Sequence, residues 1–244
     1  MGRIAIHCEP GIEWQKRRAP QFVKGLKALG IHGFLTNSRV RVTDHAILLG
    51  TTCWRGVEAS GDYLLVDRAS FGDPDFVTLG WNGHGRRAQF DMPTGYGGRW
   101  KRYKRLVHLY SWDYCGDRTV LCGQTETYSP HYETLEDWYA TVEATHFRPH
   151  PQGHNPTALP YTRDWTDCGQ AVTLNSSIGV ESVIKGIPTV TMDEGAMAWQ
   201  VSSHEPGEFY TPNRSKWLEW LCWTQWSWSE IDQGLPIRHL FASI

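Results

Sequence analysis

The sequence predicts an α/β protein in which two Rossmann-like halves each carry a parallel sheet. Three observations lead to this prediction. Short apolar segments alternate with helical segments along both halves, glycines and prolines fall at the joins, and residues 172–192 form a complete strand–helix–strand pattern. A chain of 244 residues is long enough for one large or two small domains with buried cores. We expect an N-terminal domain at residues 1–115 and a C-terminal domain at residues 116–244.

The first half opens with an expected strand at residues 3–8, followed by a loop that holds Glu9. Residues 16–29 should form a helix, because their apolar residues fall on one face and Gly30 provides a stop. Residues 68–100 are rich in glycine and aromatic residues, which is typical of a long functional loop or hairpin. Three further apolar runs are expected parallel strands: residues 32–35, 46–50 and 63–67.

The second half adds an expected strand at residues 118–124 and a helix at residues 133–144 before the strand–helix–strand unit. Residues 101–114 mix charged and aromatic residues and are expected to bridge the two halves. The chain has 13 tryptophans, and several of them fall broadly on one side of an expected C-terminal helix at residues 214–231.

Polar residues stand between the first strand and the helix of the 172–192 unit. Asn175, Ser176 and Ser177 follow the apolar strand and precede the helical stripe, which Gly186 ends. Ligands of an open parallel sheet bind beyond the carboxyl ends of its strands, and a helix that starts there offers free N–H groups to a phosphate. The sequence therefore predicts an anion site here. The alternative is plain helix capping, for which serine and asparagine are common.

A second motif lies at residues 145–151, where a short strand ends in Arg148 and His150. If this strand neighbours the one before the two serines, its cation and imidazole reach the same anion. Glu181 lies on the first turns of the following helix, where a carboxylate can accept both hydroxyls of a ribose. A phosphate next to a ribose is a nucleotide. The alternative for His150 is an ordinary loop histidine between two prolines.

The His-Pro strand end, the later Ser-Ser helix start, the glutamate and the Gly-x-Pro that follows resemble the donor-binding half of GT-B glycosyltransferases. The likeness covers about residues 118–200 and is greatest to bacterial sialyltransferases and to capsule and Kdo transferases, whose His-Pro and Ser-Ser motifs hold the nucleotide phosphate. It implies a GT-B-like fold of two halves facing a cleft, with the tryptophan-rich C-terminal helix crossing back to the first domain. The alternative for that helix is an ordinary core stripe. The resemblance also implies a nucleotide-sugar donor, with these residues as its binding site: Gly123, Gln124, Arg148, His150, Asn175, Ser176, Ser177 and Glu181.

Sugar transfer with inversion at the anomeric carbon requires a group that takes the proton from the attacking hydroxyl, and we expect a carboxylate of the first half. Asp67 is the first candidate because it ends an expected strand. Asp73 is the second, although it can equally cap a turn before a proline. Glu9 is the third, in a position similar to that of the acidic residue of Kdo transferases. The structural alternative for Asp67 is an ion pair with Arg68.

Two segments indicate a nucleic-acid partner. Residues 77–90 combine glycines, an aromatic plate and two arginines, and they resemble a stretch of tailed-phage proteins, as does the tryptophan-rich tail. Residues 99–105 place five cations among two aromatic residues in a chain of net charge −2, so the positive field is local. The alternative is a solvated helix face or a linker. The expected DNA-binding residues are Trp81, Arg86, Arg87, Arg99, Lys101, Arg102, Lys104 and Arg105.

Together these observations favour a transferase that resembles phage-encoded DNA glycosyltransferases. The expected acceptor is a 5-hydroxymethylpyrimidine, such as hydroxymethylcytosine, in duplex DNA, reached by base flipping. A UDP-sugar such as UDP-glucose is preferred as donor by analogy with phage DNA glucosyltransferases, although the paired motifs are similar to those of CMP-sugar enzymes. Two alternatives stay open. One keeps the fold with a polysaccharide or lipid acceptor, and the other is a non-enzymatic nucleotide-binding or virion protein with a degenerate GT-B site.

Other features limit cofactors and location. The six cysteines show no Cys-x-x-Cys pair, which argues against a disulfide framework or a thiolate zinc site. His146, His150 and His154 have helical spacing, but the prolines between them forbid a helix, so we expect no metal requirement. The Asp-x-Asp match at residues 73–75 lies in the half away from the expected donor site. Neither a signal peptide nor an apolar run of membrane-spanning length is present, which favours the cytoplasm, that of the host if the chain is phage-encoded.

Overall fold

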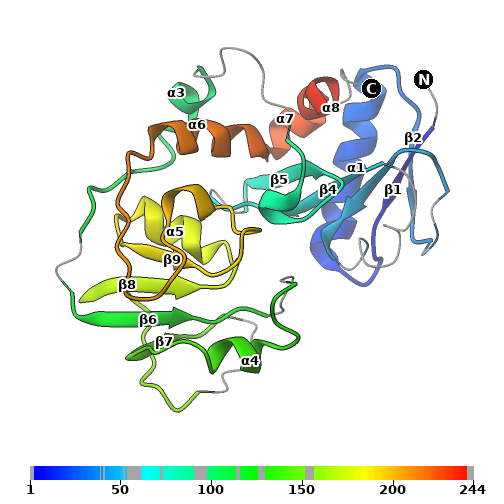
Figure 1. Cartoon of the computed structure of the whole chain (residues 1–244). Helices are drawn as coiled ribbons and strands as arrows, with labels where there is room; N and C mark the ends of the chain where they lie inside the picture. Colours follow the sequence, from blue (N-terminus) through cyan, green and yellow to red (C-terminus); the bar gives the residue numbers. More distant parts are fainter. Residues whose placement is uncertain are drawn as a thin grey trace. The chain divides into compact units, whose positions relative to one another are not determined.

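The computed structural model describes residues 3–38, 40, 42–51, 53, 62–71, 74–90, 98–113, 116–125, 130–151 and 157–240. The chain divides into two compact units. Unit 1 contains Met1–Arg99 and Glu219–Ile244, and unit 2 contains Trp100–Leu218. Both units are α/β and both contain parallel strands, as the sequence predicts (Figure 1). No helix among the described residues is long and apolar enough to cross a membrane.

Unit 1 is built on a six-stranded sheet with the order β10-β5-β4-β3-β1-β2. The four predicted strands are present and run parallel, and they are β1 (Ile4–His7), β2 (Gly33–Thr36), β3 (Ala46–Leu49) and β4 (Tyr63–Arg68). The strands β5 (Phe76–Trp81) and β10 (Gln225–Ser227) are antiparallel additions. Residues 68–100 are expected from the sequence to form a long loop or hairpin. The antiparallel pairing of β4 and β5 agrees with a hairpin, but the expectation of a loop is wrong for β5, whose six residues are buried within the sheet.

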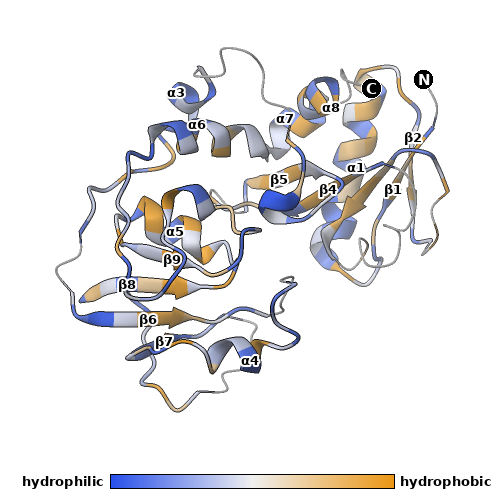
Figure 2. Cartoon of the chain, viewed as in Figure 1, coloured by the Kyte–Doolittle hydropathy of each residue, from blue (hydrophilic) through white to orange (hydrophobic). Residues whose placement is uncertain are grey.

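Helix α1 (Glu13–Ala28) packs on this sheet and carries the expected apolar face. Phe22 and Leu26 are fully buried, and the rings of Phe22 and Trp228 form a T-shaped contact with 6.2 Å between centroids. Gly25 lets two helices approach closely, since a Cβ atom there would lie 2.1 Å from the carbonyl oxygen of Ile231. The helices at the C-terminus of this core are α7 (Trp228–Asp232) and α8 (Leu235–Leu240). Figure 2 shows hydrophobic residues along β1 and mixed colours on α1, as expected for a buried strand and an amphipathic helix.

Unit 2 contains a four-stranded, all-parallel sheet with the order β7-β6-β8-β9. Its strands are β6 (Arg118–Cys122), β7 (His146–Arg148), β8 (Cys168–Thr173) and β9 (Thr189–Thr191). The predicted strand–helix–strand unit is thus β8, α5 (Ile178–Ile184) and β9. One face of the sheet packs a core around Trp138 and Phe147, both fully buried. The predicted helix at residues 133–144 is shorter, with α4 at Leu135–Tyr139 and a capping box formed by Thr134 and Asp137.

The unit boundaries differ from the predicted division after residue 115. Residues 100–113 belong to unit 2, and the chain returns to unit 1 within helix α6 (Ser215–Thr224). The single helix predicted at residues 214–231 is wrong in its middle, where β10 separates α6 from α7. Residues 225–227 pair with β5 as a strand, and this pairing buries Trp226, which is 2% exposed. A new helix, α7, then begins at a capping box formed by Ser227 and Glu230.

Candidate functional site

The carboxyl ends of β6 and β7 meet closely at one edge of the unit 2 sheet. Gly123 follows β6, and its N–H donates to the carbonyl oxygen of Arg148 at 2.8 Å. A Cβ atom on Gly123 would lie 2.8 Å from the Phe147 ring and 3.2 Å from the backbone nitrogen of His150. Only glycine therefore allows this approach. The structure brings Gly123, Arg148 and His150 together, as the sequence predicts.

An amide pair joins the ends of β6 and β8. Gln124 Nε2 donates to Asn175 Oδ1 at 3.2 Å, and the Asn175 backbone N–H donates to Gln124 Oε1 at 3.3 Å. Two buried polar atoms at the end of β8 have no hydrogen-bond partner among the described residues, namely Thr173 Oγ1 and Asn175 Nδ2. A buried polar atom without a partner costs about 1–3 kcal/mol, so such atoms are concentrated where a ligand or a water completes the site. The sequence pointed to Asn175 but not to Thr173, which as the last residue of a buried strand gives no signal of this kind.

Arg148 is held by an aromatic ring and a carboxylate. Its guanidinium lies 4.6 Å from the Trp165 ring centroid, its Nη1 donates to the carbonyl of Arg163, and its Nη2 is 3.8 Å from Glu181 Oε1. The same Glu181 oxygen accepts from the Trp165 indole N–H at 3.0 Å. The side chains of Arg148 and Glu181 remain 21% and 42% exposed, respectively. Both predicted residues therefore lie on one face, where Trp165 contacts the side chains of both. Nothing in the sequence singles out Trp165.

Cys122 on β6 is a buried cysteine close to this cluster. Burial raises the pKa of the Cys122 thiol far above its usual range, and this effect outweighs the attraction of Arg148 for a thiolate. Cys122 is 1% exposed and lies on the strand between those of Arg148 and Thr173. Its side chain belongs to a hydrophobic core cluster with Val120 and Ala171.

Helix α5 provides fewer free donors than predicted. It has seven residues, and the N–H groups of Gly179 and Val180 already donate to the carbonyls of Ser176 and Ser177 at 3.1 and 3.0 Å. Ser176 Oγ accepts from the Ile178 N–H at 3.4 Å, whereas Ser177 is the N-cap residue without a side-chain cap bond. The predicted cap is therefore made by Ser176. Ser177 is exposed.

The carboxyl end of β4 in unit 1 carries a carboxylate–imidazole pair. Asp67 Oδ2 lies 2.8 Å from His84 Nε2, and Asp67 Oδ1 accepts from the Arg68 backbone N–H at 2.8 Å. Burial raises the pKa of Asp67, but the hydrogen bond and charge of His84 and the Arg68 N–H together outweigh it and leave this pKa below its ordinary value. The sequence identified Asp67 but not its partner His84, which lies 17 residues later in the glycine-rich segment.

Of the other two carboxylates predicted to remove the proton, Glu9 is described by the structure and Asp73 is not. Glu9 follows β1, and β3 separates β1 from β4 in the sheet, so Glu9 and Asp67 stand at the same edge. The Glu9 backbone N–H donates to Gln15 Oε1 at 2.6 Å. Asp73 lies outside the described residues. Among those that are described, no group of three His, Cys, Asp or Glu side chains could hold a metal ion.

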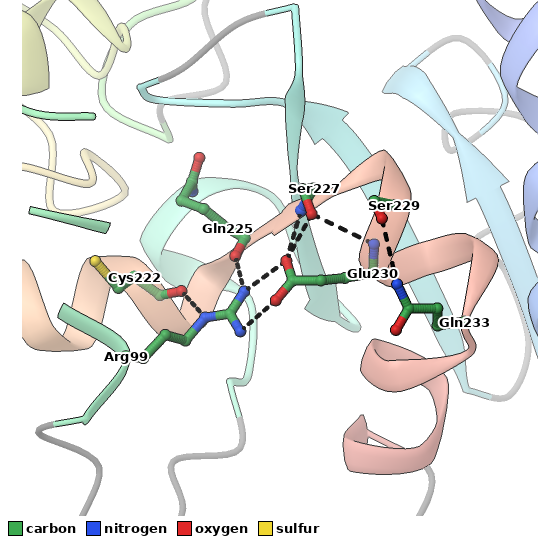
Figure 3. A network of polar contacts seen from close by, with 7 residues as sticks. All are labelled: Arg99, Cys222, Gln225, Ser227, Ser229, Glu230 and Gln233. Atoms are coloured by element: carbon green, nitrogen blue, oxygen red, sulfur yellow. Dashed lines mark hydrogen bonds and ion pairs between the residues drawn. The ribbon is translucent and has the colours of Figure 1, made fainter. Parts of the chain in front are cut away.

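Two predicted DNA-binding residues are buried in unit 1. Trp81 is 7% exposed and its indole N–H donates to the carbonyl of Leu240 at 3.2 Å, so it is a core residue and the prediction is wrong there. The prediction that Arg99 binds DNA is also wrong. Its Nε donates to the Cys222 carbonyl at 2.5 Å and its Nη1 to Glu230 Oε1 at 2.9 Å (Figure 3). Enclosure by partners leaves no face of Arg99 for a phosphate.

The remaining cations of that prediction stay at the surface of their units. Arg86 and Arg87 lie in η1 (Gly85–Arg87) of unit 1. Helix α3 (Gly98–Tyr103) and the turn after it carry the others in unit 2, and Figure 2 colours α3 as largely hydrophilic. The exposed cations of this segment are Lys101, Arg102, Lys104 and Arg105.

A hollow of about 600 Å³ lies at the opposite edge of the unit 2 sheet. It is lined by Gly116, Asp117, Arg118, Thr145, His146 and Asp167, which precede or begin the parallel strands. The residues that bear donor-site chemistry stand at the carboxyl edge instead. We place the candidate site at the carboxyl edge because polar side chains from three strands converge there, as in other open parallel sheets.

No protein-family model matches the chain, and no curated protein sequence matches it. The chain is similar to the solved structure of Thermosulfurimonas dismutans KpsC, a beta Kdo 2,7 transferase. The TM-score is 0.55 at 14% sequence identity, and the match covers 96% of this chain and 98% of that chain. The likeness shows that the chain has a GT-B-like α/β fold, as predicted from the resemblance to Kdo transferases.

Proposed function

We propose that the chain is a glycosyltransferase that moves a sugar from a nucleotide donor to a hydroxyl group. The observation that supports this most is the coincidence of two features. The fold likeness to a Kdo transferase extends over nearly the whole chain, and the residues of the paired motifs come together at the carboxyl edge of the unit 2 sheet. A GT-B-like fold alone would support many activities.

We assign nucleotide binding to unit 2. Arg148 at the end of β7 and His150 just after it would face the phosphate, together with the two serines that follow β8. The Arg148 guanidinium would stabilise the negative charge that develops on the phosphate as the glycosidic bond breaks. Glu181 would accept from the ribose. Gln124 and Asn175 position the strand ends through their reciprocal amide bonds. The side-chain nitrogen of Asn175, which has no hydrogen-bond partner among the described residues, would gain an acceptor from the ligand.

The proposed donor is an activated sugar of the CMP class, with the UDP class second. The paired His-Pro and Ser-Ser motifs are similar to those of CMP-sugar enzymes, and the similar solved structure is a Kdo transferase. The preference for UDP depended on a DNA acceptor, and that acceptor has lost two of its supporting residues, Trp81 and Arg99.

The proposed acceptor is a glycan hydroxyl, in keeping with the transferase likeness. Proton removal is assigned to the carboxyl end of β4 in unit 1, where Asp67 is located. A second candidate acceptor is a hydroxymethylpyrimidine of duplex DNA. One observation favours it, the four exposed cations that follow one another in and after α3.

The test is an assay of the whole chain with CMP- and UDP-sugars, including CMP-Kdo, offered in parallel with oligosaccharide acceptors and with hydroxymethylated duplex DNA. We expect release of free nucleotide that depends on an acceptor, and sugar found on a glycan. Sugar found on DNA would select the second acceptor. Nucleotide binding without turnover on any pair would contradict the proposal and favour a non-enzymatic nucleotide-binding protein.

A further inference from the structure

Trp165 is the point at which three segments of unit 2 meet. It lies in the loop before β8, whereas Arg148 ends β7 and Glu181 lies on α5. The Arg148 guanidinium lies 4.6 Å from the centroid of the Trp165 ring, and the indole N–H donates to Glu181 Oε1 at 3.0 Å. One side chain therefore contacts, through its ring and through its N–H, the two residues that we assign to the phosphate and to the ribose.

The loop that carries Trp165 is fixed from within. Asp164 Oδ1 accepts from the backbone N–H of Thr166 at 3.1 Å, and the Trp165 carbonyl oxygen accepts from the Cys168 N–H at 3.2 Å. Asp167, the last residue before β8, has φ 54°, a left-handed conformation that aspartate tolerates better than most residues. The Trp165 ring packs against the core cluster that contains Cys168. The position of the indole is therefore set before any ligand binds.

Arg148 and Glu181 lie close together without a direct hydrogen bond. Arg148 Nη2 is 3.8 Å from Glu181 Oε1, whereas an arginine–carboxylate pair that bonds directly has N to O distances of about 2.7–2.9 Å. Arg148 Nη1 donates instead to the carbonyl of Arg163, two residues before Trp165. The loop thus holds the cation and the carboxylate apart, so neither has to break a strong pair to reach a ligand.

The carboxylate of Glu181 has one oxygen directed at the protein and one left for a ligand. Its contacts with Arg148 and with Trp165 both use Oε1, and no described residue bonds Oε2. The Glu181 side chain is half-exposed. A carboxylate whose orientation is fixed through one oxygen can accept from a ligand hydroxyl with little further loss of side-chain freedom. A deoxyribose lacks one of the two ring hydroxyls that a ribose offers to such a carboxylate.

We propose that Trp165 is a positioning residue that makes the donor site select ribonucleotides over deoxyribonucleotides. The inference rests on the proposed function and adds to it the residue that sets selectivity for the sugar of the nucleotide. The indole N–H holds Glu181 toward the ribose, and the ring holds Arg148 toward the phosphate. The two tasks are separable, because a phenyl ring retains a face for Arg148 but has no N–H for Glu181.

Calorimetric titration of the whole chain with CMP, 2′-deoxy-CMP and cytidine measures the two tasks separately. The preference for CMP over 2′-deoxy-CMP reports on the ribose contact, and the preference for CMP over cytidine reports on the phosphate contact. Trp165→Phe should lower the first preference by about tenfold, the lower end of what a hydrogen bond to a charged group is worth, and leave the second nearly unchanged. Trp165→Ala should lower both preferences. UDP, 2′-deoxy-UDP and uridine are titrated in parallel.

Trp112→Phe is the matched control. Trp112 also has an arginine over its ring, since the Arg214 guanidinium lies 3.9 Å from the centroid, and its indole N–H donates to the Pro212 carbonyl at 3.0 Å. It lies beside Gly186, which follows α5 at the end away from the candidate site. The substitution removes the same N–H group within the same unit, so we expect both preferences to stay at their wild-type values. Thermal unfolding checks that both phenylalanine variants are folded.

A double-mutant cycle shows whether Trp165 acts through Glu181. Glu181→Ala should abolish the preference for the ribose. Adding Trp165→Phe to this variant should then cause no further loss of that preference, because the partner of the indole N–H is already gone. A further loss in the double variant would show that Trp165 does not act through Glu181 and would overturn the proposal.

The other outcomes are equally decisive. Loss of the ribose preference in Trp165→Phe, with the phosphate preference retained, supports the proposal. Equal binding of CMP and 2′-deoxy-CMP by the wild type, an unchanged ribose preference in Trp165→Phe, equal falls in both preferences, or equal effects of Trp165→Phe and Trp112→Phe overturn it, while nucleotide binding by the wild type leaves the proposed donor site intact. Absence of nucleotide binding by the wild type overturns the proposed function, and this inference falls with it.

Discussion

Arg99 in unit 1 and Arg148 in unit 2 each place a guanidinium against a tryptophan ring and a glutamate, but they differ in how fully the cation is enclosed. Arg99 lies 4.0 Å from the Trp226 centroid and bonds Glu230 at 2.9 and 3.1 Å, and the two charged side chains are 7% and 2% exposed. Arg148 lies 4.6 Å from the Trp165 centroid, and its glutamate is 3.8 Å away and 42% exposed.

The two cations differ in their surroundings: Arg99 is enclosed by its partners, whereas Arg148 is the cation that we propose faces the nucleotide phosphate. The guanidinium of Arg99 has its donors directed at a carboxylate and two backbone carbonyls. Arg148 stands at a strand end with a loose ion pair that a phosphate could replace. Four predictions test this comparison, in order of decreasing effect.

Arg99→Ala should cause the largest loss. It leaves Glu230 buried without its cation, and breaking a buried pair by removing one partner costs about 3–5 kcal/mol. Denaturant unfolding of the variant measures the loss. The double variant Arg99→Met with Glu230→Leu, which removes both charges, should recover much of the stability. A loss below about 1 kcal/mol in Arg99→Ala would fall in the range of a surface pair and contradict the structural role.

Arg148→Ala should instead weaken nucleotide binding and leave folding nearly unchanged. The loss of a charge-assisted hydrogen bond to phosphate is worth about 1.5–3 kcal/mol, or roughly 10- to 150-fold in Kd. Calorimetric titration with CMP and UDP measures it. Arg118→Ala is the matched control, since Arg118 is a cation of the same sheet at its opposite edge with a carboxylate 3.7 Å away. Equal affinities in wild type and Arg148→Ala would remove Arg148 from the donor site.

Asp67→Asn should have a smaller effect than the two arginine variants, and the effect should appear in how the free energy of unfolding depends on pH. Because the pKa of Asp67 is lowered in the folded state, its ionised form stabilises the fold above the unfolded carboxyl pKa of about 3.9. That contribution is lost as the pH falls through the lower folded value. Unfolding free energies measured from pH 7 down to pH 2 should therefore fall less steeply in Asp67→Asn than in wild type. If the free energy of unfolding falls equally steeply with decreasing pH in both proteins, the pair of Asp67 with His84 does not stabilise the fold.

Replacing the exposed cations that follow Arg99 should have the smallest effect on stability, within about 0.5 kcal/mol for each surface position. If they contact DNA phosphates, the salt slope of binding should become shallower by up to about 3.6, since each contact contributes about 0.9. The residues changed to alanine are Lys101, Arg102, Lys104 and Arg105. The control removes four exposed cations of α1 in unit 1, namely Lys16, Arg17, Lys24 and Lys27. Equal slopes in both variants would exclude this segment as a DNA surface.

The periodic and local features of the fold were predictable from sequence. The parallel strands of both sheets and the α5 unit follow from short apolar runs between glycines and prolines, because burial and backbone preferences act locally there. The strand β10 was not predictable. Its partner β5 lies about 150 residues away, and the pairing overrides a helical pattern that continues through Trp226.

The candidate site was predictable where a strand end bears the chemistry. Arg148, Asn175 and Asp67 stand where their strands stop, and the order of strands brings the first two to one edge. His84 and Trp165 were missed because they come from loops, whose direction depends on tertiary contacts. Arg99 was misassigned because a run of cations carries no sign of which member will turn inward toward Glu230.

Hydrogen–deuterium exchange with and without saturating CMP, and separately UDP, tests most directly the claim that the carboxyl edge of the unit 2 sheet binds a nucleotide. The account predicts added protection in the segments that contain Gly123 and Gln124, Arg148 and His150, and Asn175 to Ser177. Protection confined to the hollow around Arg118, His146 and Asp167, or no protection with either nucleotide, would contradict it.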